Sequence, residues 1–426
     1  MAARVADRAT RIRGVLPVKQ RLAATFCLLL AAACPALANT DPYVPADDGV
    51  VLEHVPPASH PAVKQMTTLR RRLTANPDDR DLAVKLARAY IDFGRHRGDA
   101  RYLGYAEAVI APWLQADHQL PLDIALLNAT LLQSRHHFEA AEKALKRIIQ
   151  HDPDNRQAWL TLATAATVQA KFDLARTACA HLLTVSDRLV SAGCIAGLAS
   201  VIGGADEAYD LLGRLTSTNS FAGEKKLEGD AARAIRAWIE GLMADAAKRL
   251  GRDAAAEKHF RAALELTPGD NFLLADYADF LLDQHRPRDV IKLLKDYQRS
   301  DTSFLRYVFA EAELGLPGAE ADIDAMAGRF AALDRRGSHV YRREQARFVL
   351  RALHDPERAL KLAAQNWRVQ RAPWDIRVYL AAALAAKQPR AALPALKVYE
   401  SSGLHDPHIA PLAAKLRAQL NQVVRQ

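Results

Sequence analysis

Apolar residues recur every three or four positions over most of this chain, which is the period of an amphipathic helix. The helical segments come in pairs. One pair carries its apolar residues at Ala125, Ala129, Leu132, Phe138, Ala141, Leu145 and Ile148. Proline follows a second segment at Pro153 and again at Pro268, where its ring and its missing N–H end a helix. No stretch alternates apolar and polar residues as a half-buried strand does. The pattern therefore predicts an all-α chain.

The pairs recur with a period of about 34 residues. One unit reads Trp159-x2-Leu162-Ala163 and then Ala175-x3-Cys179, and another has Ala256-x3-Phe260 before Pro268. These motifs resemble the tetratricopeptide repeat family, whose pattern is W-x2-L-G-x2-Y, then A-x3-F, then P. The resemblance implies a right-handed α-solenoid superhelix of stacked antiparallel helix pairs. It also implies a protein that binds partners rather than one that catalyses a reaction.

The chain divides into four predicted segments. Residues 1–38 form a signal peptide, and residues 39–61 form a proline-rich extended tether. Residues 62–302 carry the tetratricopeptide-like repeats, and residues 303–426 carry degenerate helical repeats that end in a capping helix. We expect roughly nine helix pairs in all. In the first pair the two helices are spaced too widely, so Arg95–Arg101 is predicted to form an expanded turn.

The N-terminal segment has the order of a secretory signal. Basic residues precede the apolar run Leu22–Ala33, and Ala36-Leu37-Ala38 follows as a cleavage site. The run is shorter than the ~20 residues that span a bilayer. We expect cleavage before Asn39 and a mature protein in the bacterial periplasm. Lipidation of Cys34 is the less favoured alternative, and eukaryotic secretion also fits the signal.

Cleavage changes the charge and the cysteine count. Residues 1–38 hold six of the 58 Lys and Arg residues and one of the 49 Asp and Glu residues, so the formal net charge falls from +9 to +4 (52 minus 48). Only Cys179 and Cys194 remain, in a compartment that favours disulfides. They fall on neighbouring helices of successive units, which predicts a disulfide between them. The alternative is a pair of small buried thiols.

The family resemblance also implies a concave groove lined by the first helices of the pairs. Its candidate lining residues here are Arg88, Leu126, Thr130, Leu160, Thr164, Asp245, Asp279 and Asp283. The Lys and Asn residues with which some family members grip a terminal carboxylate are absent from these positions. We therefore expect a groove that is apolar to hydroxylic at first and acidic later, suited to an extended or helical apolar peptide. The alternatives are an unused groove and one filled by the chain's own N-terminal segment.

A basic stripe stands out near the C-terminus. Arg343, Arg347 and Arg351 are spaced four residues apart, within a region of eleven basic and four acidic residues from Arg335 to Arg377. The favoured interpretation is a solvated helix face. The alternative is a surface for an anionic partner or for lipid headgroups. Peripheral membrane association would follow from the latter but is not predicted, and nucleic acid is not an expected partner.

The sequence contains no enzyme motif of the common kinds, such as HExxH, GxSxG, Walker A or paired C-x2-C. His405 and His408 would hold a metal only weakly, because no third ligand is apparent nearby. We therefore predict no catalytic residues, no metal and no cofactor. The expected function is a periplasmic scaffold for a protein or peptide partner. The alternative is an accessory or assembly factor for an envelope enzyme or transport system, including one that handles metal ions.

Overall fold

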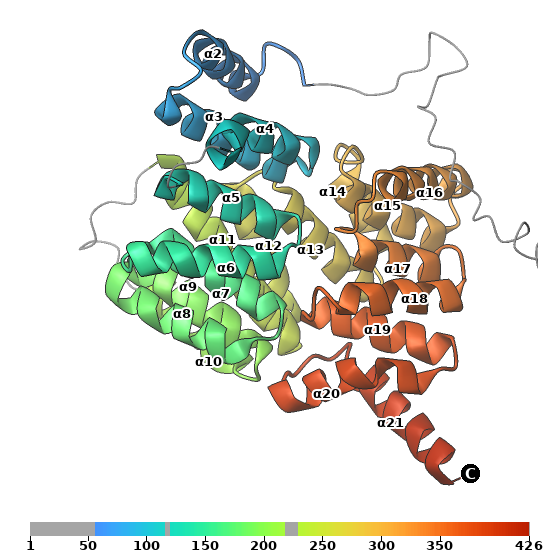
Figure 1. Ribbon diagram of the computed structural model, residues 1–426. Coiled ribbons are helices and arrows are strands. Elements are labelled where there is room, and N and C mark those ends of the chain that lie inside the picture. The colour runs from blue at the N-terminus through green and yellow to red at the C-terminus, as the bar shows by residue number, and fades with distance from the viewer. Residues whose placement is uncertain (1–55, 116–119, 218–228, 426) are drawn as a thin grey trace, which may run out of the picture. The chain divides into compact units, whose positions relative to one another are not determined.

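The computed structural model describes residues 56–115, 120–217 and 229–425, and the secondary structure in these ranges is helical throughout, with no strand (Figure 1). The predicted signal peptide, with Cys34, and residues 39–55 of the tether lie outside the described residues. Residues 55–426 form one compact unit. Among the described helices, none combines the length and the apolarity needed to cross a bilayer.

Nine helix pairs follow one another in the described part of the chain. They are α3 (Arg80–Arg97) with α4 (Arg101–Gln115), α5 (Leu122–Ser134) with α6 (Phe138–His151), α7 (Arg156–Val168) with α8 (Phe172–Val185), α9 (Arg188–Val201) with α10 (Ala205–Ser217), α11 (Gly229–Arg249) with α12 (Asp253–Leu266), α13 (Asn271–Asp283) with α14 (Pro287–Leu294), α15 (Asp301–Leu314) with α16 (Ala319–Arg335), α17 (Arg342–Arg351) with α18 (Pro356–Trp367), and α19 (Pro373–Ala385) with η2 (Pro389–Ala392) and α20 (Leu393–Ser402). Helix α2 (Pro61–Ala75) precedes the first pair, and α21 (Ala410–Arg425) follows the last. Nearly every helix packs on the next one along the chain, which confirms the predicted all-α solenoid.

Local sequence signals set the ends of these helices. Asp79, Asp187 and Asp270 precede α3, α9 and α13, and each side chain accepts a hydrogen bond from a backbone N–H of the first turn. The turns inside the pairs α5/α6 and α7/α8 share a left-handed residue, with φ of 61° at His136 and 57° at Ala170. The repeat in sequence is therefore also a repeat in backbone conformation.

The first pair differs from its prediction. Helix α3 continues through Arg97, so the extra residues lengthen the helix and do not expand the turn. Gly98 ends the helix in the left-handed conformation, with φ of 65°, where glycine carries no steric penalty. The predicted expanded turn at Arg95–Arg101 is wrong, because the helix continues through Gly94 and on to Arg97 and ends only at the left-handed Gly98.

Small residues let the helices approach closely. Ala141, Ala175 and Ala256 are fully buried where the helices of a pair meet. At Gly193 on α9, an added Cβ would lie 2.6 Å from the indole ring of Trp238 on α11, so the glycine leaves room for the tryptophan. Glycine at this position lets α9 and α11 pack closely, although glycine inside a helix also weakens that helix.

The disulfide is present as predicted. Cys179 on α8 bonds to Cys194 on α9, with Cα atoms 5.5 Å apart. Both residues belong to a buried apolar cluster that includes Leu182 and Leu198. The bond joins the third helix pair to the fourth.

The array is also closed on itself by contacts between residues far apart in sequence. Gly98, at the turn of the first pair, packs so tightly that a Cβ there would lie 2.5 Å from Ser300 Oγ and 2.7 Å from Asn271 Cγ. The turn of the second pair contacts a residue still later in the sequence, since the Gln370 side-chain nitrogen lies 3.0 Å from His136 Nε2. Burial lowers the pKa of His136 to about 4, so this imidazole is neutral at pH 7.

Two further contacts continue this row. The backbone N–H of Arg371 donates to the carbonyl of Val168, at the end of α7, with a distance of 2.8 Å. Arg249, at the end of α11, donates to Asp406 at 3.3 Å. The first, second, third and fifth pairs thus touch the second half of the chain near the end of their first helix. A repeat pattern alone does not predict these contacts.

Candidate functional site

The early groove residues remain accessible in part. Arg88 on α3 and Thr164 on α7 are exposed, whereas Leu126 and Thr130 on α5 and Leu160 on α7 are half-buried. The Thr130 hydroxyl donates to the Leu126 carbonyl (2.9 Å) and the Thr164 hydroxyl to the Leu160 carbonyl (3.0 Å). These threonines therefore present methyl groups and lone pairs to a ligand, because their donors are already engaged.

The later, acidic groove residues are all paired within the chain. Asp245 on α11 contacts Arg249 at 2.8 Å. Asp283 on α13 accepts two hydrogen bonds from Arg377, at 2.7 and 2.8 Å. Asp279 is 2% exposed and is surrounded by arginines. The predicted acidic half of the groove is therefore neutralised by the protein's own cations.

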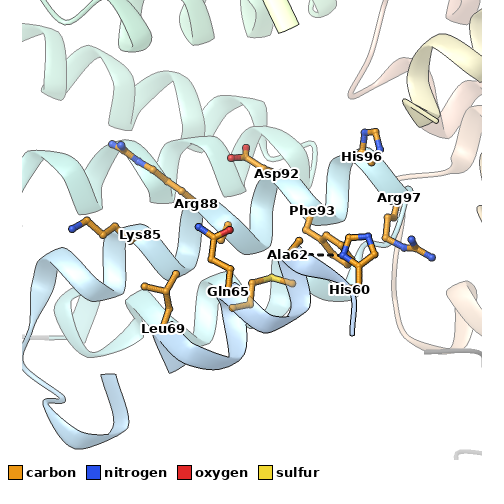
Figure 2. A pocket seen from close by; sticks show the side chains of 12 residues that line it. His60, Ala62, Gln65, Leu69, Lys85, Arg88, Asp92, Phe93, His96 and Arg97 are labelled. Carbon is orange, nitrogen blue, oxygen red and sulfur yellow. Dashed lines mark hydrogen bonds between the residues drawn. The ribbon is translucent and has the colours of Figure 1, made fainter. Parts of the chain in front are cut away.

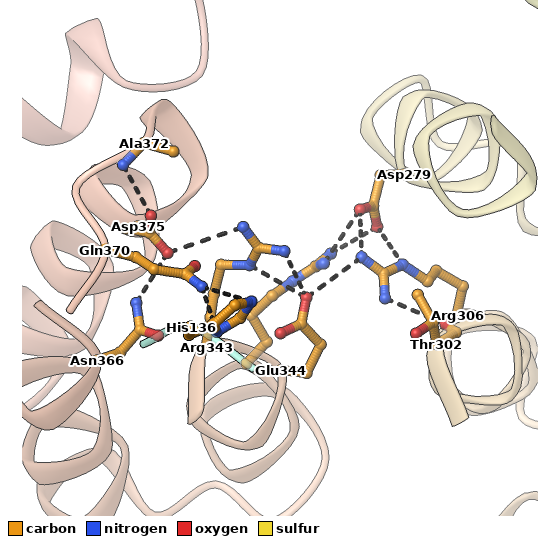
Figure 3. A network of polar contacts seen from close by, with 11 residues as sticks. His136, Asp279, Thr302, Arg306, Arg343, Glu344, Asn366, Gln370, Ala372 and Asp375 are labelled. Atoms are coloured by element: carbon orange, nitrogen blue, oxygen red, sulfur yellow. Dashed lines mark hydrogen bonds and ion pairs between the residues drawn. The ribbon is translucent and has the colours of Figure 1, made fainter. Parts of the chain in front are cut away.

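Asp279 is the centre of this buried charge network (Figure 3). Arg306 on α15 donates to it at 2.7 Å, and Arg347 on α17 donates at 2.6 Å. Burial by itself would raise the pKa of Asp279, but the two guanidiniums outweigh burial and hold this pKa well below its usual range. The carboxylate is thus ionised at every physiological pH and joins α13 to α15 and α17.

The basic stripe belongs to the same network. Arg347 is 4% exposed, and its guanidinium lies 4.2 Å from the centre of the Trp374 ring. Arg343 is half-buried and donates to Glu344 at 2.8 Å, while Arg351 is exposed and lies 3.6 Å from Glu313. The prediction of a solvated face is wrong for Arg347. The stacking of pairs six to eight brings α17 close to α13, so this arginine meets an aspartate 68 residues away in sequence.

The C-terminal end of the network continues through Arg343. Its guanidinium lies 3.7 Å from Asp375 at the start of α19. Asp375 also accepts from the Asn366 amide at 2.8 Å and from the Ala372 backbone N–H at 2.7 Å, as Figure 3 shows. Since every member has polar partners, the network acts as a structural joint between helix pairs.

His405 and His408, considered above as weak metal ligands, have different surroundings in the structure. His408 lies 3.5 Å from Asp283, and His405 is exposed. Within the ranges that the structure describes, no three His, Cys, Asp or Glu side chains gather as metal ligands would.

An open cleft of about 590 Å³ lies between α2 and α3 (Figure 2). Its lining residues are His60, Ala62, Gln65, Met66, Leu69, Lys85, Arg88, Ala89, Asp92, Phe93, His96 and Arg97. Of the predicted groove residues it contains Arg88. A signal for the α3 wall is present in the sequence, in the spacing of Lys85, Arg88 and Asp92 on one side of a helix. No such signal is present for α2, which belongs to no repeat pair.

The cleft combines positive charge with an apolar floor. Lys85, Arg88 and Arg97 face it against the single carboxylate of Asp92. Burial raises the pKa of Asp92, and the neighbouring arginines Arg95 and Arg88 oppose this rise. Such a surface attracts ligands that carry both negative charge and apolar groups.

The His60 end of the cleft is ordered by local contacts. His60 Nδ1 accepts a hydrogen bond from the Ala62 backbone N–H at 3.2 Å and so caps α2. Its ring meets the edge of Phe93 with centroids 5.5 Å apart, and the Arg97 guanidinium lies 5.5 Å from the same phenyl ring. One end of the cleft is therefore fixed by packed side chains.

Comparison with known proteins bears on the fold alone. No protein-family model matches the chain, and no curated protein matches it in sequence. The chain is similar to the solved structure of PilW, a widely conserved type IV pilus biogenesis factor, with 14% identity over 50% of this chain and 96% of that chain and a TM-score of 0.38. It is also similar to a human IFIT1 dimer with m7Gppp-AAAA, with 13% identity over 85% of this chain and 86% of that chain and a TM-score of 0.43. For yeast Tom70 the identity is 11% over 85% of this chain and 86% of that chain, with a TM-score of 0.37.

Proposed function

We propose that this protein is a non-enzymatic interaction scaffold of the bacterial periplasm, which holds a protein or peptide partner on the face of its N-terminal repeats. The proposal rests on a difference in charge pairing and exposure between the early and the late part of the predicted groove. Its acidic residues from Asp245 onward are paired with arginines of the same chain, whereas Arg88 and Thr164 remain exposed. The partner surface of the array is therefore its first three pairs.

A capture experiment tests the binding role. The mature chain, residues 39–426, would be used as bait in envelope extract, beside a Thr164→Arg variant and a Lys143→Glu control. Thr164 is an exposed groove position, and Lys143 is exposed on α6, the second helix of its pair. We expect a protein captured by the wild type and the control but lost from Thr164→Arg. Equal capture by all three would place the partner elsewhere and contradict the proposal.

The export role has its own test. The full chain, expressed in a bacterium with a C-terminal tag, should be recovered from the periplasm with Asn39 as its first residue. A lipid on Cys34 would support the anchored alternative instead. Retention of the uncleaved chain in the cytoplasm would contradict the proposed location.

A further inference from the structure

We propose that the cleft between α2 and α3 binds an extended acidic peptide, whose carboxylates are spaced along the chain with apolar side chains between them. The inference rests on the proposed function, because it specifies the chemistry of the partner. The ligand would lie at the N-terminal edge of the array, between the first repeat helix and a helix outside the repeats.

The spacing of the cations points to an extended ligand. Lys85 and Arg97 lie at opposite ends of the cleft, with Arg88 between them (Figure 2). Twelve helical residues at 1.5 Å each separate the ends by about 18 Å. An extended peptide covers that distance in about five or six residues, at about 3.3 Å each. Cations spread in this way do not converge on one phosphate group.

The floor of the cleft explains why the ligand also needs apolar groups. Its accessible apolar surface comes from the half-buried Ala62, Leu69 and Ala89, with small parts of the buried Met66 and Phe93. Apolar contact would supply affinity, because it removes surface from water, while the surrounding charges set register and speed association. Lys85 and Arg88 are exposed, so they can reach carboxylates along the rim.

The same floor disfavours single-stranded nucleic acid. Bases bind such surfaces by stacking on exposed aromatic rings. Phe93 is the one phenyl ring among the lining residues, and it is 8% exposed, with His60 and Arg97 packed against it. The cleft therefore offers cations without a free phenyl, phenol or indole face.

The α2 wall can adjust to a ligand. Met66 is the single buried residue of this fifteen-residue helix. Few buried contacts allow local displacement at low free-energy cost. The cleft can thus open along α2 while α3 stays fixed in the array.

Fluorescence anisotropy with the mature chain tests the proposal. The probe is a labelled decapeptide with two glutamates about five positions apart and leucine and valine between them, matched by a peptide with glutamine at both positions. The test variant is Lys85→Glu with Arg88→Glu. The control is Lys143→Glu with Arg147→Glu on α6, which makes the same charge change at two exposed positions. Arg88→Gln provides a milder second variant, and circular dichroism verifies that all of them fold.

We expect the acidic peptide to bind the wild type and the α6 control equally. Binding should weaken at least about tenfold in the double variant Lys85→Glu with Arg88→Glu, and less in Arg88→Gln. High salt should weaken binding to the wild type in the same way. Equal binding of the glutamine peptide, or no loss in either cleft variant, would overturn the proposal. So would stronger competition by a decauridylate or by phosphatidylglycerol vesicles than by unlabelled peptide.

The capture experiment separates this proposal from the scaffold role. A partner that the double variant still captures from envelope extract would refute the cleft as its site and leave the scaffold standing. If the peptide binds but the wild type captures no protein, the scaffold role fails while the cleft chemistry holds.

Discussion

Replacing Asp279 with alanine should loosen the joint between α13, α15 and α17. The substitution removes the carboxylate shared by Arg306 and Arg347, which are 3% and 4% exposed. Two guanidiniums then stay buried without their main counter-charge. Breaking a buried ion pair in this way costs about 3–5 kcal/mol. The exposed pair of Asp289 with Arg286 provides the control, since its loss should cost at most about 1 kcal/mol.

Hydrogen exchange is the suitable assay, because unfolding of a long repeat array is not a single two-state step. In Asp279→Ala we expect exchange in α13, α15 and α17 to accelerate by roughly two to four orders of magnitude, which corresponds to about 3–5 kcal/mol of lost protection. Helices α6 to α8 should keep their protection, because stability in such arrays is mainly a sum of neighbouring contacts. Asp289→Ala should change little anywhere.

The pH dependence provides a second measurement. The pKa of Asp279 is lowered in the folded state, so its contribution to stability is fully present above the unfolded value of about 4. That contribution is lost as the pH falls below it, and the same helices should lose protection in the wild type. An Asp279→Ala variant no more labile than Asp289→Ala at neutral pH would refute the reasoning.

Three other predictions concern separate parts of the array. Gly193→Ala should lower the free energy of unfolding by about 1–3 kcal/mol, because the added methyl group overpacks against the Trp238 indole. Gly197→Ala should be neutral or slightly stabilising, because its Cβ would meet only the end of a leucine side chain at 3.3 Å. Equal losses of stability in urea titrations of the two variants would contradict this. Glu311 is buried, and its pKa is raised to about 7, first by burial and then by a neighbouring carboxyl group, so charging it destabilises the fold as the pH rises through 7. The variant Glu311→Gln should therefore be more stable than the wild type at pH 8, by about 1–3 kcal/mol, and its melting temperature should be unchanged at pH 4. Replacing Cys179 and Cys194 with serine should lower stability by up to about 3 kcal/mol and increase proteolysis around residues 186–224 only, and two free thiols in the exported protein would end this prediction.

The helices could be located from the sequence because their signals are local. The apolar period predicted helical repeats over residues 303–426 although the consensus fades there, and the structure has α15 at Asp301–Leu314 and α19 at Pro373–Ala385. The disulfide was also predictable, because neighbouring helices of successive units always pack together, so two cysteines placed on them meet. Proline, N-cap residues and small residues at helix crossings act within one or two helix pairs, which is the range that a repeat pattern describes.

Tertiary structure decided which charged residues meet and which remain free. Asp279 and Arg347 look like two separate surface features in the sequence, and they become one buried ion pair only because the stacking of pairs six to eight brings α13 and α17 together. That meeting depends on the rotation between successive helix pairs, so no single motif encodes it. The α2 wall of the cleft is another case, since α2 belongs to no repeat and only its packing on α3 gives it a role. The sequence by itself thus determined the helices and their pairing, while the accumulated geometry of the array decided which charged side chains are buried in pairs and where the α2/α3 cleft lies.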